Sequence, residues 1–234
     1  MSPDTPVVHA ELGTNRVLQV TSSGGDLTNA FAQADHVVRQ QYHVQRLAPV
    51  PMETRGLVAD YQSQEERLTV WDSTQNPHGM KPRLAQLLGL PEPNVRVVTP
   101  DVGGGFGEKG CLFPEEVAIS YLATRLERPV KWVAERHENQ LGFHGRGHTV
   151  EVEAAARNDG TLLGIRVDIV ADLGAYFLLS TPTVPVSTSH RLTGPYTTPA
   201  MRVEVRGVVT NKPPTGAYCG AGGPEASFCM ERTI

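Results

Sequence analysis

The residues best suited to hold a ligand form a glycine-rich run from Pro100 to Gly110, with the letters PDVGGGFGEKG. Five of its last eight residues are glycines, and Phe106 is the only large apolar side chain among them. Glycine leaves main-chain N–H groups uncovered and adopts backbone angles that other residues avoid, so such a run can close on an anion or an oxo group. The pattern predicts a cofactor cradle, with a flexible surface turn as the alternative.

Two phosphate-binding motifs can be compared with this run. A P-loop requires glycine directly before lysine, whereas Glu108 precedes Lys109 here. The stretch Gly105 to Gly110 does satisfy G-x-G-x-x-G, although Glu108 would place a negative charge beside a pyrophosphate. A non-catalytic nucleotide-binding or interaction module that uses this turn therefore stays open as an alternative function.

Three further groups could take part in chemistry. Gln75 ends an expected strand, and its amide can donate to an oxo or phosphate oxygen, unless it is only an exposed turn residue. A second glycine-rich loop, residues 212–223, contains Cys219, whose thiol is either activated near a helix start or inert and half-buried. His144 and His148 are four apart but separated by two glycines, which favours loop histidines over a helical zinc pair. We predict that Gln75 and the two glycine loops converge on one ligand.

The elements that position these groups alternate between hairpins and strand–loop–helix units, which predicts an α+β fold with mixed sheets. Residues 173–199 read as a long loop that can carry a short helix. The last helix has no terminating glycine, asparagine or proline, so we expect the chain to be a piece of a longer protein. Expected strands cover residues 6–10, 16–20, 36–45, 54–61, 67–72, 94–98, 130–133, 150–157, 162–171 and 202–210, and expected helices cover residues 27–34, 78–88, 113–126, 135–141 and 224–234.

Composition narrows the class of protein. The 234 residues are 39% hydrophobic and 20% charged, as in a soluble globular chain that can bury a core. A net charge of −4 disfavours a nucleic-acid surface, and no apolar run is long enough to cross a membrane. Three scattered cysteines build neither a disulfide framework nor a metal knuckle, and no signal peptide is visible, so we expect a reduced, cytoplasmic protein.

Taken together, several segments resemble the molybdenum-binding large subunit of the molybdenum hydroxylases, the family of xanthine dehydrogenase, aldehyde oxidase and aerobic carbon monoxide dehydrogenase. The resemblance spans nearly the whole chain, and the Gly-Gly-Gly-Phe-Gly run with the preceding Thr-Gln is its most specific part. The segments that carry it are Ala48 to Gly56, Trp71 to Pro77, Asp101 to Lys109, Arg128 to Trp132 and Gly216 to Ala226.

The resemblance implies a molybdenum–molybdopterin cofactor, in its cytosine dinucleotide form, and hydroxylation of an aldehyde or N-heterocycle with water as the oxygen source. In that family the glutamine that matches Gln75 hydrogen-bonds the apical oxo ligand, and the main-chain amide that matches Gly107 is aimed at the same oxygen. Gln75, Phe106 and Cys219 are the residues expected to surround molybdenum. The cofactor-binding residues implied are Gln75, Gly104, Gly105, Phe106, Gly107, Ala217, Tyr218, Cys219 and Gly220.

The sequence departs from the family pattern at four positions. Gly220 stands where the carbon monoxide-oxidising enzymes have a copper-binding cysteine, which disfavours a Mo–Cu site. Cys219 and Gly223 replace two arginines of the related "form II" group, whose loop this one resembles most, so an arginine-dependent substrate clamp is lost. The glutamate that helps xanthine dehydrogenase bind purine aligns with Gly110.

The resemblance also implies what lies outside the chain. The general-base glutamate is expected beyond Ile234, so no catalytic residue is expected within residues 1–234. Electrons would pass to iron–sulfur clusters and FAD on partner subunits. Residues 1–25 would be the end of a preceding domain or a linker, and residues 26–234 the first part of the cofactor-binding domain. We expect this portion alone to bind cofactor poorly and to have no turnover.

Overall fold

The computed structural model describes residues 5–234 and divides into two compact units. Unit 1 comprises the described residues up to Leu47 together with His144–Ile234, and unit 2 comprises Ala48–Phe143. Unit 2 is therefore an insertion in the chain of unit 1. Its two ends leave unit 1 side by side, since Leu47 and Gly145 exchange main-chain hydrogen bonds of 3.1 and 2.8 Å.

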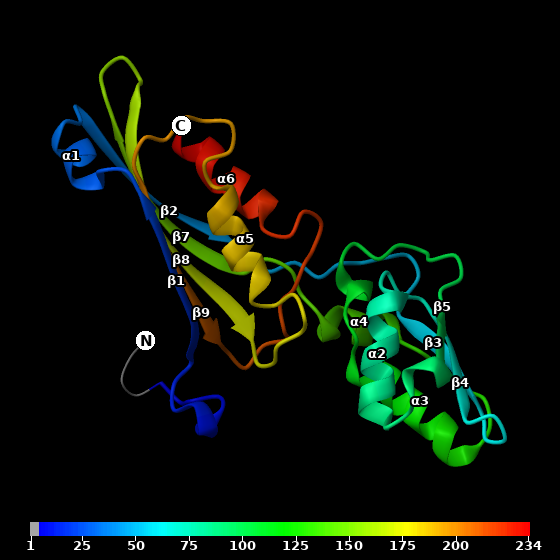
Figure 1. Cartoon of the computed structure of the whole chain (residues 1–234). Helices are drawn as coiled ribbons and strands as arrows, with labels where there is room; N and C mark the ends of the chain where they lie inside the picture. The colour runs from blue at the N-terminus through cyan, green and yellow to red at the C-terminus, as the bar shows by residue number, and fades with distance from the viewer. Residues whose placement is uncertain (1–4) are drawn as a thin grey trace. The chain divides into compact units, whose positions relative to one another are not determined.

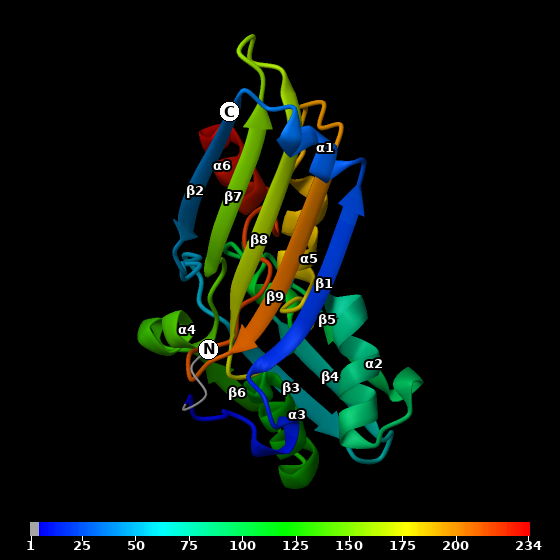
Figure 2. The ribbon, with the colours of Figure 1, turned by 90° about the vertical axis from the view of Figure 1, so that its left-hand side faces the viewer.

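Unit 1 is a five-stranded sheet in the order β1-β9-β8-β7-β2, seen face-on in Figure 2. Only the β8–β9 pair is parallel. Helices α5 and α6 cover one face of the sheet (Figure 1), where alternate strand residues such as Val150, Ile169 and Val205 form the core. The elements of unit 1 are η1 (Ala10–Leu12), β1 (Arg16–Gly24), α1 (Leu27–Ala32), β2 (His36–Val44), β7 (His148–Ala156), β8 (Leu162–Gly174), α5 (Thr183–Arg191), β9 (Met201–Val209) and α6 (Gly223–Thr233).

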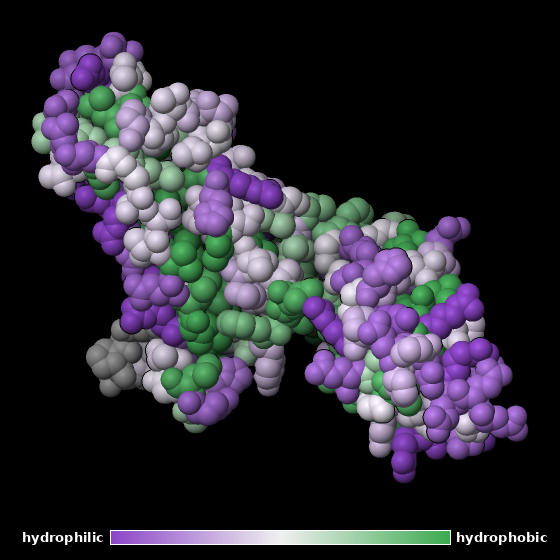
Figure 3. Space-filling model, in the orientation of Figure 1, coloured by the Kyte–Doolittle hydropathy of each residue, from purple (hydrophilic) through white to green (hydrophobic). Residues whose placement is uncertain are grey.

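Unit 2 is a four-stranded sheet in the order β5-β4-β3-β6, with helices α2 and α3 packed against it. Its core includes Leu68, Val70 and Leu84, and the β4–β5 pair is parallel while the other two are antiparallel. The surface of unit 2 visible in Figure 3 is mostly hydrophilic, whereas unit 1 shows an apolar strip beside α5. The elements of unit 2 are β3 (Gly56–Gln62), β4 (Arg67–Asp72), α2 (Pro77–Leu88), η2 (Glu92–Asn94), β5 (Val95–Val98), η3 (Glu108–Gly110), α3 (Pro114–Leu126), β6 (Val130–Val133) and α4 (Arg136–Gly142).

These elements confirm the predicted α+β class with mixed sheets. Asp26 caps α1 by accepting a hydrogen bond from the Asn29 amide. The long segment after β8 does carry a helix, α5. Two local predictions were wrong: a 3₁₀ turn, η1, occupies the end of the expected strand at residues 6–10, and His148 begins strand β7 rather than lying in a loop. Strand β1 pairs with β9. The expected domain boundary at residue 25 stays a prediction.

Candidate functional site

In unit 2 the glycine run forms an irregular loop between β5 and η3. Gly104 and Gly107 have φ angles of +94° and +106°, which residues with a Cβ rarely adopt. Phe106, with φ +53°, holds a left-handed conformation without being glycine, and the residue is 48% exposed. A large apolar side chain kept exposed on a loop of unusual backbone angles is typical of a binding surface rather than of a core.

Gln75 is seated against this loop. Its Oε1 accepts a hydrogen bond of 2.9 Å from the Gly107 amide, and a Cβ added at Gly105 would lie 2.4 Å from the same oxygen. Only glycine at position 105 therefore leaves room for Gln75. Because a main-chain N–H can only donate, the bond fixes the carbonyl end of Gln75 toward the loop and leaves its Nε2 group as a free donor.

The resemblance led us to expect the Gly107 amide to point at a ligand oxygen, and that role stays a prediction. In this structure the amide donates to Gln75 Oε1. The other predicted donors of the loop are uncommitted. Within residues 5–234, no atom accepts a hydrogen bond from the amides of Gly104, Gly105 or Phe106. Three free amides and the Gln75 Nε2 group make this surface rich in donors.

The main chain on either side of Gln75 is tied to the end of the loop. The Gln75 amide and the Thr74 Oγ1 both donate to the Lys109 carbonyl, at 2.8 and 2.9 Å. Asn76 then caps α2 by accepting from the Gly79 amide. Strand β4, the loop and the start of α2 thus fix the Gln75 backbone.

The buried side chain of Lys109 holds the residues that anchor the loop. Lys109 Nζ is fully buried and donates to Glu53 Oε2 at 2.7 Å and to Ser73 Oγ at 2.8 Å. The same Glu53 oxygen accepts from the Gly103 amide at 2.8 Å. Burial raises the pKa of Glu53, but the bonds from Lys109, Ser73 and the Gly103 amide outweigh it and lower the pKa to about 2. Glu53 therefore holds the loop as a carboxylate at every ordinary pH.

Deeper in unit 2 lie carboxyl groups that sequence reasoning missed or misplaced. Glu108, which a dinucleotide-binding turn would place beside a pyrophosphate, is fully buried and accepts two hydrogen bonds from Asn139. Burial raises the pKa of Glu108 and of Asp72 to about 7, and that of Glu116 to about 8. The buried Arg55 guanidinium opposes these shifts without overcoming them. Part of this interior is consequently protonated near neutral pH.

The segment between the glycine turn and α3 does not match a dinucleotide-binding turn. That motif requires the glycine turn to open a helix directly, but η3 and Cys111–Phe113 separate Gly107 from α3, which begins at Pro114. The geometry of this turn therefore disfavours the nucleotide-binding alternative.

The second glycine loop lies in unit 1. The Ala217 amide donates to Ser180 Oγ at 3.0 Å, and Cys219 is an exposed free thiol. Gly222, with φ +95°, is packed so tightly on α5 that an added Cβ would lie 2.7 Å from the Thr188 amide nitrogen. Within the described chain, no atom accepts from the amides of Cys219 and Gly220. This loop therefore also presents free donors.

The structure thus collects the predicted site residues into two groups. Gln75, Gly104, Gly105, Phe106 and Gly107 form one surface in unit 2, and Ala217 to Gly220 form another in unit 1. That the two surfaces converge on one ligand stays a prediction.

His144 lies in an isolated bridge with Thr215, and residues 5–234 hold no group of three or more His, Cys, Asp or Glu residues that could bind a metal ion directly. The donor-rich backbone suits a metal carried by an organic cofactor, whose oxygen and sulfur atoms accept hydrogen bonds.

A family profile described as "Molybdopterin cofactor-binding domain" matches residues 8–234. The chain belongs to this family. It is 41% identical over 231 residues to the nicotine 6-hydroxylase large subunit of Paenarthrobacter nicotinovorans, covering 97% of this chain and 28% of that one. It is 36% identical over 251 residues to the carbon monoxide dehydrogenase large chain of Hydrogenophaga pseudoflava, covering 100% and 31%.

A solved relative supports the same membership. Quinoline 2-oxidoreductase from Pseudomonas putida 86 superposes with a TM-score of 0.85 at 35% identity, covering 93% of this chain and 29% of that one. The molybdopterin-binding chain thus spans less than a third of the length of these relatives. No helix in residues 5–234 is both long and apolar enough to cross a membrane. Family membership confirms the resemblance to the molybdenum hydroxylases, while the roles of single residues stay predictions.

Proposed function

We propose that this chain forms part of the molybdenum site of a multi-subunit hydroxylase, which oxidises an N-heteroaromatic ring or an aldehyde with water as the oxygen source. The arrangement around Gln75 carries the proposal. Its carbonyl is bound to the Gly107 amide, so its Nε2 group and the free amides of Gly104 to Phe106 remain to bind the cofactor. The bound cofactor supplies the redox chemistry, and the protein supplies donors and orientation.

The residues fit such a cofactor in a specific way. The Gln75 Nε2 group would be the donor to an oxygen of the bound cofactor, and the exposed Phe106 side chain would give a flat substrate an apolar wall. In unit 1, the amides of Cys219 and Gly220 are also free donors, and we propose that they bind cofactor. The general base is assigned to a glutamate outside residues 1–234. We further propose the cytosine dinucleotide form, partner subunits that carry iron–sulfur clusters and FAD, and a cytoplasmic location.

Among substrates, we favour an N-heteroaromatic ring over an aldehyde. The relatives reported above include proteins named for nicotine and quinoline, at 41% and 35% identity. Carbon monoxide is disfavoured although similar chains carry its name. Gly220 has φ +97°, and an added Cβ there would lie 2.7 Å from the Pro224 ring, so a copper-binding cysteine does not fit this loop.

The experiment uses the polypeptide that carries this chain, co-expressed with its iron–sulfur and FAD subunits. Molybdenum is measured by metal analysis, and dye reduction is measured with pyridine- and quinoline-type substrates, aldehydes and carbon monoxide. We expect stoichiometric molybdenum and fastest turnover with a ring substrate. Fastest turnover with an aldehyde would reassign the substrate, and activity toward carbon monoxide would contradict the argument from Gly220. Absence of both molybdenum and turnover would contradict the whole proposal.

A matched pair of variants tests the role of Gln75. Gln75→Glu keeps an acceptor for the Gly107 amide but removes the Nε2 donor, and we expect turnover to fall by about 100-fold. Gln86→Glu makes the same change of charge at an exposed position on α2 and should leave turnover unchanged. Equal rates in the two variants would mean that Gln75 does not face the reacting centre.

A further inference from the structure

Arg146 occupies a backbone position that suits glycine better. It lies between Gly145 and Gly147 in the segment that joins unit 2 to β7, and its φ angle is +69°. A residue with a Cβ is strained in this left-handed region, whereas glycine is not. The side chain must therefore make contacts that offset this cost.

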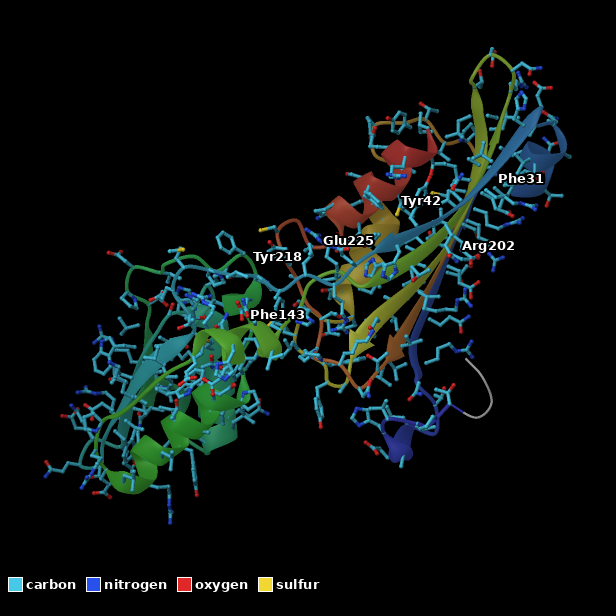
Figure 4. All side chains as sticks on the ribbon, turned by 180° about the vertical axis from the view of Figure 1, so that it is seen from behind. Phe31, Tyr42, Phe143, Arg202, Tyr218 and Glu225 are labelled. Atoms are coloured by element: carbon cyan, nitrogen blue, oxygen red, sulfur yellow. The ribbon has the colours of Figure 1, made fainter. Side chains whose placement is uncertain are left out.

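Those contacts are made with the second glycine loop and the start of α6. Arg146 Nη1 donates to Glu225 Oε2 at 2.8 Å, and the two side chains are only 10% and 1% exposed. Arg146 Nη2 donates to the Cys219 carbonyl at 3.3 Å, and the guanidinium carbon lies 5.2 Å from the Tyr218 ring centroid. Figure 4 shows Tyr218 on the loop and Glu225 at the beginning of the helix that follows it.

Gly145 and Arg191 also hold the segment around Arg146 and the second glycine loop in close contact. A Cβ added at Gly145 would lie 2.4 Å from the Tyr218 Cβ, so only glycine lets the arginine segment approach the loop. A second arginine binds the next carbonyl of the loop: Arg191 Nη1 donates to the Gly220 oxygen at 3.0 Å. Two consecutive carbonyl groups are thus bound by guanidinium groups.

The bond to Cys219 determines where the next amide points. In a trans peptide, C=O and N–H point in opposite directions, so the Gly220 N–H faces away from Arg146. No atom of residues 5–234 accepts from that N–H. The Gly220 amide is therefore held as an unused donor, with a positive charge behind it.

We propose that Arg146 is a positioning residue for the molybdenum cofactor. Anchored by Glu225, it orients the Cys219–Gly220 peptide so that the Gly220 N–H is available to an electron-rich atom of the cofactor. The inference rests on the proposed function, in which this loop contacts the cofactor. The arginine itself touches neither substrate nor cofactor and acts only through the loop.

The test needs a variant that removes the arginine without leaving a buried charge. Arg146→Gly combined with Glu225→Gln does this, and glycine also suits the φ angle of +69°. The matched control is Arg166→Ala with Glu153→Gln, which removes a 2.7 Å ion pair between β7 and β8 in the same unit. Circular dichroism melts establish that both double variants fold.

The first readout is loop order, measured by ¹⁵N relaxation on the chain. We expect order parameters at Cys219 and Gly220 near 0.85 in the unaltered chain and in the control, and below about 0.6 in the Arg146 double variant. The second readout is molybdenum retained by the polypeptide co-expressed with its partner subunits. We expect it to match in the unaltered protein and the control and to fall at least tenfold in the Arg146 double variant.

The outcomes separate this inference from the proposed function. Molybdenum retention unchanged by the Arg146 double variant, or unchanged loop order, overturns the inference alone. Absence of molybdenum from the unaltered protein overturns the proposed function and the inference with it. Arg146→Lys keeps the charge but lacks the fork that reaches both Glu225 and Cys219, so it should retain less molybdenum than the unaltered protein. Full retention by this variant would show that the Cys219 bond is not needed.

Discussion

At the scale of single residues, the site depends on Gly105, whose backbone lies so close to Gln75 that no side chain fits between them. The Gly105 backbone adopts an ordinary φ angle, so alanine is tolerated there by the main chain. Its Cβ would nevertheless lie 2.4 to 2.7 Å from three atoms of Gln75. A methyl group at position 105 and the observed place of Gln75 therefore exclude each other.

This exclusion gives a prediction that a double-mutant cycle can test. We expect Gly105→Ala to change the free energy of unfolding by less than about 1 kcal/mol, because Gln75 is exposed and can move away. It should lower turnover about as much as Gln75→Ala, because both remove the same donor. The two changes combined should cost no more than either alone. Additive losses would mean that Gly105 contributes to the site independently of Gln75.

Residue types alone indicated this part of the site but not its supports. A glycine run followed by charged residues reads as an exposed turn, yet Glu108 and Lys109 are both buried. Their partners, Glu53 and Asn139, lie more than 30 positions away along the chain, so no local pattern could have revealed them. Arg146 was equally hidden, since its value depends on reaching Cys219 and Glu225 across the fold.

At the scale of elements, the buried carboxyl groups between β4, η3 and α3 make unit 2 sensitive to pH. Asp72 ends β4, its Oδ2 has no partner, and burial raises its pKa to about 7. A carboxyl group whose pKa is raised on folding stabilises the folded state fully below its unfolded pKa, near 4. That stabilisation is lost as the pH rises toward 7. Glu53 and Asp172 have lowered pKa values of about 2, so their contributions are lost only below pH 4.

We therefore expect Asp72→Asn to reduce the loss of stability between pH 5 and pH 8 by on the order of 2 kcal/mol. Both tryptophans, Trp71 and Trp132, lie in unit 2, so urea unfolding followed by tryptophan fluorescence reports on this unit. Asp101→Asn, at an exposed position in the same unit, is the control. Parallel pH profiles for the unaltered chain and Asp72→Asn would show that Asp72 is not a buried, protonated group.

The contact between the second loop and α5 can be tested in the same way. Gly160 and Gly222 both have positive φ angles, but a Cβ at Gly160 meets no atom within 4 Å. A Cβ at Gly222 would lie 2.7 Å from main-chain atoms of α5. Gly160→Ala should cost about 1 kcal/mol from backbone strain, and Gly222→Ala should cost at least about 2 kcal/mol more. Circular dichroism melts measure both, and equal costs would mean that the loop is not held against α5.

At the scale of the whole molecule, periodicity and turn signals were enough to predict nearly every strand and helix. They could not give the order of strands in the sheets, because the parallel pairs β4–β5 and β8–β9 join strands separated by long crossovers. Nor did the sequence pattern indicate that unit 2 is inserted into the chain of unit 1. The boundaries lie in a proline-rich run after Leu47 and a glycine-rich run around His144, but the chain crosses there through a paired bridge rather than a flexible segment.

That paired crossing leads to a prediction about unit 2 as a separate folding unit. Residues 48–143 have their own core around Leu68, Val70 and Leu84, and the Lys109–Glu53 and Arg55–Glu116 pairs lie wholly within it. We expect this segment, expressed alone, to unfold cooperatively and to lose stability from pH 5 to pH 8 as Asp72, Glu108 and Glu116 ionise. Urea unfolding by tryptophan fluorescence, compared with the full chain, measures both properties. A non-cooperative transition would mean that unit 1 is needed to hold the glycine run and Gln75 in place.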